Sequence, residues 1–191
     1  KCEGRLTGLP MTSPAFIFDF DSTLVRIETL EALAEIALAD APDAAARKAE
    51  IAALTEQAMG GQIDFGTALN RRLELLAPSR AHVEALADRI LDEATASIRR
   101  NVDFFERHAE RIYILSGGFR EIIAPLAERL SIPADHILCN DLVYDENDRA
   151  TSADQSNPLS RDGGKPEMIR RLKLTGPVVM VGDGWNDAEV K

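Results

Sequence analysis

The chain has 191 residues, which suits one domain or a core with a modest insertion. Its hydrophobic share of 45% excludes a disordered chain and is enough for a packed core. The formal net charge of −10 argues against a general nucleic-acid binder and against binding to anionic membrane surfaces. A small anionic substrate remains compatible with it, because local cations dominate the field inside a cleft.

Cysteine usage and the N-terminus indicate the compartment. Cys2 and Cys139 are too few for a disulfide framework or a zinc cluster. We favour two reduced thiols, although a bridge between them stays open. No apolar run could span a bilayer, and residues 1–11 lack the apolar core of a signal peptide, so Met11 is a candidate natural start. We therefore expect a cytoplasmic protein.

The first half of the chain predicts one strand followed by a long helical region. Residues 15–20 are apolar and predict a buried strand. Residues 28–100 carry three apolar stripes at helical spacing. Breaks at residues 40–43, 60–61 and 78–79 divide the region into about four helices, and Asp64 is expected to cap one of them. The stripes are Leu30, Leu33, Ala34, Ala37 and Leu38; Phe65, Leu69, Leu73 and Leu76; and Val83, Leu86, Ile90 and Leu91.

Strand signals return in the second half. Residues 111–115, 136–140 and 177–181 predict strands, and residues 141–158 a small hairpin. A helix is predicted over residues 119–130, where Pro125 should kink it or reduce its stability. Another is predicted over residues 166–173, with Pro166 at its first position.

This order of elements predicts an α/β fold: a doubly wound, parallel, Rossmann-like sheet with a helical cap inserted between strands 1 and 2. We expect residues 11–27 and 101–191 to form the core, apparently truncated at its C-terminus, and residues 28–100 to form the cap. Ligands bind such sheets at the carboxyl ends of the strands. Polar signatures stand at three of these ends, at residues 19–21, 116–118 and 182–184, and should meet in one crevice.

Four carboxylates should crowd that crevice: Asp19, Asp21, Asp183 and Asp187. The crowding is unfavourable unless a cation neutralises it. Oxygen ligands favour a hard ion such as Mg²⁺, and no histidine or cysteine lies near these motifs, which argues against zinc. A single aspartate at a strand end more often caps a helix or turn, but that explanation is unlikely to cover all four.

Two further segments indicate an anion site. Ser116 and Gly117 precede a predicted helix, where a hydroxyl and backbone N–H groups can bind an anion. An ordinary Ser cap is an equally good explanation there. Lys165 follows two glycines and opens a helix, although a lone lysine is commonly just solvated. Together these pieces describe a phosphate site in which one Asp attacks phosphorus and a second carboxyl group moves the proton.

Four ordered motifs resemble those of the haloacid-dehalogenase superfamily. They are Asp19-Phe-Asp-Ser-Thr-Leu24, Leu115-Ser-Gly-Gly-Phe119, Gly163-Gly-Lys165 and Val181-Gly-Asp-Gly-Trp-Asn-Asp187. Within the superfamily, the first two motifs and the cap position look most like phosphoserine phosphatases. The segment over residues 58–76 is similar to the cap of that family, and the resemblance covers nearly the whole chain from residue 15 onward.

The resemblance implies the roles of the catalytic residues. Asp19 would be the nucleophile and a Mg²⁺ ligand. Asp21 would be the general acid and base, and would contact the metal through its backbone carbonyl. Asp183 would be the third protein contact to Mg²⁺, with Asp187 supporting the site.

The resemblance also implies how a small phosphomonoester is held. A phosphoserine pocket needs groups that bind the phosphate, the ammonium and the carboxylate, and Arg suits a carboxylate because its planar fork binds two oxygens. Glu28 could instead be an ordinary first-turn acid, and Arg72 a surface arginine. The implied assignments are Ser116, Gly117 and Lys165 to the phosphoryl group, Asn186 close to the substrate, Glu28 and Arg72 to the amino acid, and Met59 and Phe65 to the cap side.

Other functions fit the same motifs, and the sequence differs from the family's pattern in two places. The same motifs fit a phosphatase or phosphotransferase for another small phosphomonoester, or a fragment that binds phosphate with little activity. A non-catalytic aspartyl-phosphate switch is disfavoured, since a cap over the site is what an enzyme needs to exclude water. Trp185 stands where the family more often has a small residue. Family members also continue beyond the fourth motif, so residues 178–181 should form an exposed sheet edge.

Overall fold

The computed structural model describes residues 13–183. Its core is a four-stranded parallel sheet in the order β3-β2-β1-β6. Its strands are β1 (Ala15–Phe18), β2 (Ile112–Phe119), β3 (Ile137–Asn140) and β6 (Val178–Val181). Each predicted strand is present, and the central strand β1 is the first in the chain.

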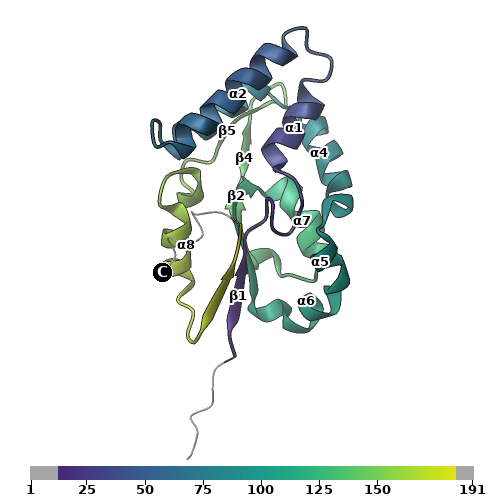
Figure 1. Ribbon diagram of the computed structural model, residues 1–191, viewed down its shortest axis with the longest axis vertical. Helices are drawn as coiled ribbons and strands as arrows, with labels where there is room; N and C mark the ends of the chain where they lie inside the picture. The colour runs from purple at the N-terminus through teal and green to yellow at the C-terminus, as the bar shows by residue number, and fades with distance from the viewer. Residues whose placement is uncertain (1–12, 184–191) are drawn as a thin grey trace, which may run out of the picture.

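Alternate residues of β1 face opposite layers of the molecule. Phe18 packs in a cluster with residues of α6 (Val102–His108) and α7 (Arg120–Arg129), whereas Ile17 packs with residues of α8 (Gly164–Leu172). In Figure 1, α8 lies on one side of the sheet, while α5 (Ala96–Arg100), α6 and α7 lie on the other. This period-two burial and its two helical layers confirm the doubly wound α/β fold.

Four helices intervene between β1 and the return to the core: α1 (Thr29–Ala37), α2 (Ala44–Met59), α3 (Phe65–Leu76) and α4 (Arg80–Arg89). Asp64 caps α3 as predicted, because its carboxylate accepts the backbone N–H of Thr67 at 2.8 Å. The third apolar stripe fails at Leu91, which is 41% exposed. The chain tightens there into the 3₁₀ turn η1 (Ile90–Glu93), and the change of period moves Leu91 away from the core.

The helical insertion leaves and re-enters the core through two adjacent segments. Val25 pairs with Ala94 in an antiparallel bridge. On either side of it, the Arg26 N–H donates to the Glu93 carbonyl and the Thr95 N–H to the Leu24 carbonyl, both at 2.9 Å. We call these paired segments, residues 24–26 and 93–95, the stem.

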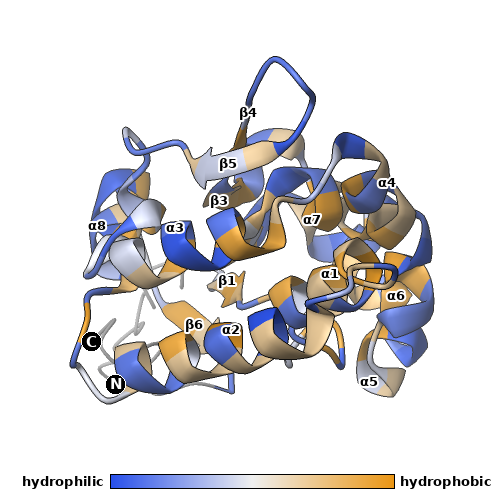
Figure 2. Ribbon diagram, turned by 90° about the horizontal axis from the view of Figure 1, so that it is seen from above, coloured by the Kyte–Doolittle hydropathy of each residue, from blue (hydrophilic) through white to orange (hydrophobic). Residues whose placement is uncertain are grey.

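A second contact ties the insertion to the core through a hairpin. As predicted, residues 141–158 contain one, formed by β4 (Leu142–Tyr144) and β5 (Ala150–Ala153) in antiparallel pairing. The Ala150 N–H donates to the Pro78 carbonyl at 2.8 Å, just beyond the end of α3. Figure 2 shows α3 running beside β5. The C-terminal end of α3 is thus anchored to the hairpin.

Two prolines lie within helices, and the position of one of them differs from the prediction. Pro166 was predicted at the first position of a helix, but α8 begins earlier, at Gly164. The fold tolerates Pro166 there because the first N–H groups of a helix have no intrahelical partner. Pro125 lies inside α7, which runs through it from Arg120 to Arg129.

Short 3₁₀ turns complete the structure: η2 (Ala109–Arg111), η3 (Ala134–His136) and η4 (Pro158–Ser160). As expected, β6 is an edge strand within residues 13–183, and its Val178, Val179 and Val181 side chains are exposed.

No helix in this range is both long and apolar enough to cross a membrane.

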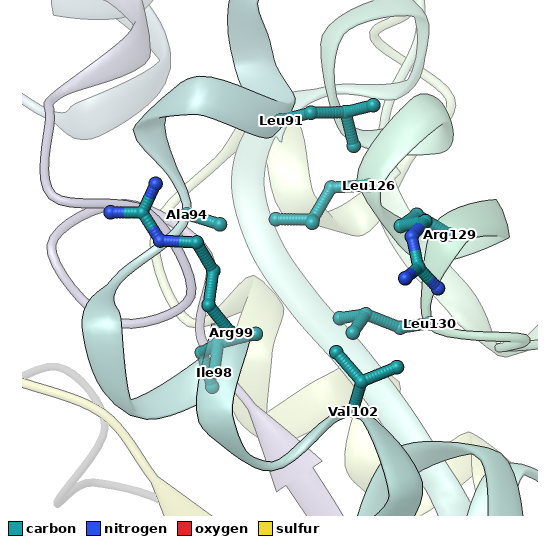
Figure 3. Close-up of a pocket in the computed structure, with 8 residues that line it drawn as sticks. All are labelled: Leu91, Ala94, Ile98, Arg99, Val102, Leu126, Arg129 and Leu130. Atoms are coloured by element: carbon teal, nitrogen blue, oxygen red, sulfur yellow. The ribbon is translucent and has the colours of Figure 1, made fainter.

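A cavity of about 300 Å³ lies between the α5–α6 region and α7 (Figure 3). Its lining is mostly apolar, with the side chains of Arg99 and Arg129 at its borders. None of the residues that the sequence assigned to the active site lines it. The candidate active site must therefore be built from the strand ends themselves.

Candidate active site

Asp19 and Lys165 meet at the carboxyl end of β1. Asp19 directly follows the strand, and its N–H donates to the Val181 carbonyl at 2.8 Å. Its Oδ2 lies 2.9 Å from the Nζ of Lys165, while its Oδ1 accepts the Phe20 N–H at 2.8 Å. The two side chains are only 13% and 18% exposed. Two motifs 146 residues apart in the sequence thus form a largely buried ion pair.

Asp21 is held by the first residue of α1, Thr29. Its two carboxylate oxygens accept the N–H and the hydroxyl of Thr29, at 3.1 and 3.2 Å. Burial, followed by the negative charge of Glu28, raises the pKa of Asp21 to about 7. A carboxyl group with this pKa can both give and take a proton near neutral pH. Sequence reasoning missed Thr29, which opens α1 and is 2% exposed.

Glu28 is oriented by a serine of the first motif. The Ser22 hydroxyl donates to Glu28 Oε1 at 2.6 Å. Ser22 has φ 52°, a left-handed conformation that non-glycine residues seldom adopt. Ser22 belongs to the first motif, but nothing in the sequence indicated that its hydroxyl would bind Glu28, six residues along the chain.

Arg72 extends from α3 toward these acids. Its Nη1 donates to Thr55 Oγ1 at 3.2 Å, and its buried Nε has no hydrogen-bond partner among residues 13–183. Burial lowers the pKa of Arg72, and the charges of Glu31, Glu28 and Asp21 act in the opposite direction. A buried guanidinium N–H without a partner suits an incoming acceptor such as a carboxylate.

The second motif lies at the end of β2 rather than at a helix start. Ser116 is 1% exposed, and its Oγ accepts the Gly118 N–H at 2.9 Å. Residues 116–118 precede a helix as predicted, but Phe119 and not Ser116 stands at the N-cap of α7, so an ordinary helix cap by Ser116 is ruled out. Pairing with β3 is interrupted between Leu115 and Phe119, so residues 116–118 leave the ladder.

Phe65 of the helical insertion lies directly against this segment. A Cβ atom added at Gly117 would come 3.1 Å from Phe65 Cζ. The first residue of α3 therefore packs on the end of β2, as a residue lining the cap side should. Met59, in contrast, is 84% exposed at the end of α2, so the structure does not pack it against the other site residues.

Asn140 links the loops of the second and third motifs and was missed in the sequence. It is fully buried, and its Nδ2 donates to the carbonyls of Gly117 and Leu159 at 2.9 and 3.0 Å. Its place at the carboxyl end of β3 was the available signal, since ligand sites of such sheets lie there.

Of the two aspartates in the fourth motif, the structure describes only Asp183. Asp183 is exposed and stands two residues beyond Val181, which pairs with Phe18, so the backbones that carry Asp183 and Asp19 run side by side. Within residues 13–183, no three His, Cys, Asp or Glu side chains form a group that could hold a metal. The assignments of Trp185, Asn186 and Asp187 lie outside the described residues, as does Cys2.

A parallel sheet with a buried Asp–Lys pair at its strand ends, covered by an inserted set of helices, defines a hydrolase class. The haloacid dehalogenase-like hydrolase family matches residues 16–190, and the chain belongs to this family.

Several known proteins similar to the chain carry the word phosphoserine in their names. Human phosphoserine phosphatase is 34% identical over 188 residues, which span 97% of this chain and 80% of that protein. A crystal structure of a phosphoserine phosphohydrolase-like protein from Francisella tularensis superposes with a TM-score of 0.78 at 28% identity, covering 93% of this chain and 82% of that one. A substrate-bound phosphoserine phosphatase complex gives 0.70 at 26% identity, covering 93% and 81%.

Proposed function

We propose that the chain is a Mg²⁺-dependent phosphatase that hydrolyses O-phosphoserine to serine and phosphate. The observation that carries the proposal is the buried Asp19–Lys165 pair, with Asp21 two residues beyond Asp19. Arg72 adds a cation close enough to Asp21 for their charges to interact. The similarity to phosphoserine phosphatases supports the choice of substrate. A related small phosphomonoester is the alternative.

The proposed reaction uses three side chains. A carboxylate oxygen of Asp19 attacks phosphorus while the bond to the serine oxygen breaks, which leaves an aspartyl-phosphate. Asp21 gives its proton to the departing oxygen and then takes one from a water molecule that attacks the same phosphorus. Lys165 balances negative charge on the phosphoryl oxygens. Release of phosphate regenerates the Asp19 carboxylate.

The donor set at the strand ends fits Mg²⁺. The carboxylates of Asp19 and Asp183 and the backbone carbonyl of Asp21 would all supply oxygen ligands, and Mg²⁺ commonly keeps several waters besides one or two carboxylates. When bound, the ion would neutralise negative charge on the phosphoryl group. Asp187 would support these ligands, with Ser116 and Gly117 holding the phosphoryl group and Asn186 close to the substrate.

Removal of the metal tests this assignment. We expect EDTA to abolish phosphate release and added Mg²⁺ to restore it, because the paired carboxylates and the phosphate otherwise repel each other. Full activity in a protein shown by elemental analysis to be metal-free would contradict the proposal.

Recognition of the amino acid is assigned to Glu28 and Arg72, with Phe65 lining the cap side. Glu28 would bind the ammonium group, and the buried Nε of Arg72 would bind the carboxylate. Met59 joins this set only in a conformation other than the one described.

A substrate panel tests the proposed specificity. We expect phosphate release from phosphoserine to exceed that from p-nitrophenyl phosphate, which has neither an ammonium nor a carboxylate. Arg72→Ala should lower kcat/KM for phosphoserine about 30-fold, since a hydrogen bond to a charged group is worth ~2 kcal/mol. Its effect on p-nitrophenyl phosphate should be less than about threefold. Equal losses on both substrates would exclude Arg72 as the carboxylate-binding residue.

The division of the chain and its compartment are part of the proposal. We assign residues 28–100 to the cap and residues 11–27 and 101–191 to the core. We also place the enzyme in the cytoplasm, where Cys139 would stay reduced. Burial raises the pKa of its thiol to about 12, so it is a packing residue and not a nucleophile.

A further inference from the structure

The N-terminal end of α3 is bound by a core residue that has no role in the site described so far. The Phe65 N–H points at the carboxylate of Asp162, 3.2 Å from Oδ1 and 3.3 Å from Oδ2. This N–H is one of the first in the helix, so it has no partner within α3. The cap of α3 thus comes from two parts of the chain, because Asp64 binds the Thr67 N–H.

Asp162 belongs to the turn that presents Lys165. Gly163 follows with φ 72°, and α8 begins at Gly164, so Asp162 stands three residues before the lysine that pairs with Asp19. A single turn therefore binds the cap helix through one carboxylate and the nucleophile through one ammonium group.

Close backbone contact accompanies this hydrogen bond. A Cβ atom added at Gly66 would lie 2.7 Å from the Ser160 carbonyl oxygen, so α3 approaches η4 as closely as only glycine permits. Farther along α3, Asn70 Oδ1 accepts the Ala153 N–H at 3.3 Å. With the hairpin holding its C-terminal end, α3 is fixed along its whole length, and Asp162 supplies the contact nearest to Phe65.

We propose that Asp162 is a positioning residue: it fixes the start of α3 so that Phe65 packs on Gly117 and Arg72 is directed at the substrate's amino-acid part. The kinetic side of this role rests on the proposed function, whereas the structural side does not. Asp162 itself does not touch the phosphoryl group, so its loss should weaken substrate binding and leave the chemical step nearly unchanged.

Amide hydrogen exchange followed by NMR tests the structural role in the ligand-free protein. In Asp162→Ala, the Phe65 amide should exchange about five- to tenfold faster, as expected from losing one exposed, charge-assisted hydrogen bond. The Thr67 amide, which Asp64 holds, serves as the internal control and should keep its rate. Asp162→Asn retains an acceptor oxygen and should restore most of the protection. An unchanged Phe65 rate in Asp162→Ala would overturn the proposal whether or not the chain is a phosphatase.

Steady-state kinetics test the positioning role. Asp162→Ala should raise KM for phosphoserine about fivefold and change kcat less than about twofold, with p-nitrophenyl phosphate unaffected. Asp154→Ala is the matched control, because the partner of that carboxylate in the described part of the chain is Ser156, within its own loop. Faster exchange with unchanged kinetics would overturn the positioning role. If the wild-type chain released no phosphate, the proposed function would fail, and the exchange rates would still decide whether Asp162 holds α3.

Discussion

Asp19→Asn should lower phosphate release by about a thousandfold or more while the protein stays folded. The amide is a poor nucleophile and carries no charge, so neither attack on phosphorus nor the ion pair with Lys165 survives. Its shape is nearly unchanged, and its Oδ1 can still accept the Phe20 N–H. The measurement is single-turnover phosphate release at saturating phosphoserine.

Trapping the intermediate separates a nucleophile from a residue that only binds. Wild-type protein quenched in acid should carry an acid-stable, hydroxylamine-sensitive phosphoryl group on Asp19, and the Asn variant should carry none. Thermal unfolding should show that both proteins are folded. Appreciable turnover in the Asn variant would exclude Asp19 as the nucleophile.

Gly164→Ala should destabilise the fold by about 3 kcal/mol, because overpacking against a rigid backbone cannot be relieved by a rotamer change. A Cβ at this position would lie 2.2 Å from the Pro158 carbonyl oxygen and 2.9 Å from Leu159 Cα. The expected result is a lower midpoint in urea unfolding. Activity should fall as well, since α8 carries Lys165.

Gly60→Ala is the matched control. Gly60 directly follows α2 with φ −77°, and the atom nearest to an added Cβ would be the Glu56 carbonyl oxygen, at 3.3 Å. The Gly60→Ala variant should change the free energy of unfolding of the protein by less than about 1 kcal/mol. Equal destabilisation by both substitutions would show that crowding against η4 is not what requires a glycine at residue 164.

The sheet was predictable because its strands carry short-range signals. The short apolar runs at residues 15–18 and 178–181 are typical of strands in a parallel sheet, and polar residues directly after them mark their ends. The helix cap at Asp64 is equally local. Leu91 and Pro166 were misplaced because helix boundaries depend on tertiary packing, which a stripe of apolar residues does not contain.

The site was predictable to the extent that its residues sit in motifs. Asp19 was expected to meet residues 116–118 and 182–184 because parallel strands end at the same edge of the sheet. Lys165, which opens a helix, was added to them only because a phosphate site calls for a cation. Thr29, Asn140 and Asp162 were not found, since each acts through a hydrogen bond that no sequence pattern indicates, to a residue between 8 and 97 positions away. Such a partner becomes visible only when the chain is folded, and Thr, Asn and Asp are common at caps and turns for purely local reasons.

The stem gives the insertion a property of its own. Residues 24–26 and 93–95 lie side by side, so everything between them leaves and rejoins the core at one place. Because these two ends lie close together, helices of another length or sequence could be grafted between them while the strand order stays intact. Asp19 and Lys165 lie outside the grafted segment. Exchange of the segment would therefore be a route by which one phosphoryl-transfer apparatus acquires new substrates.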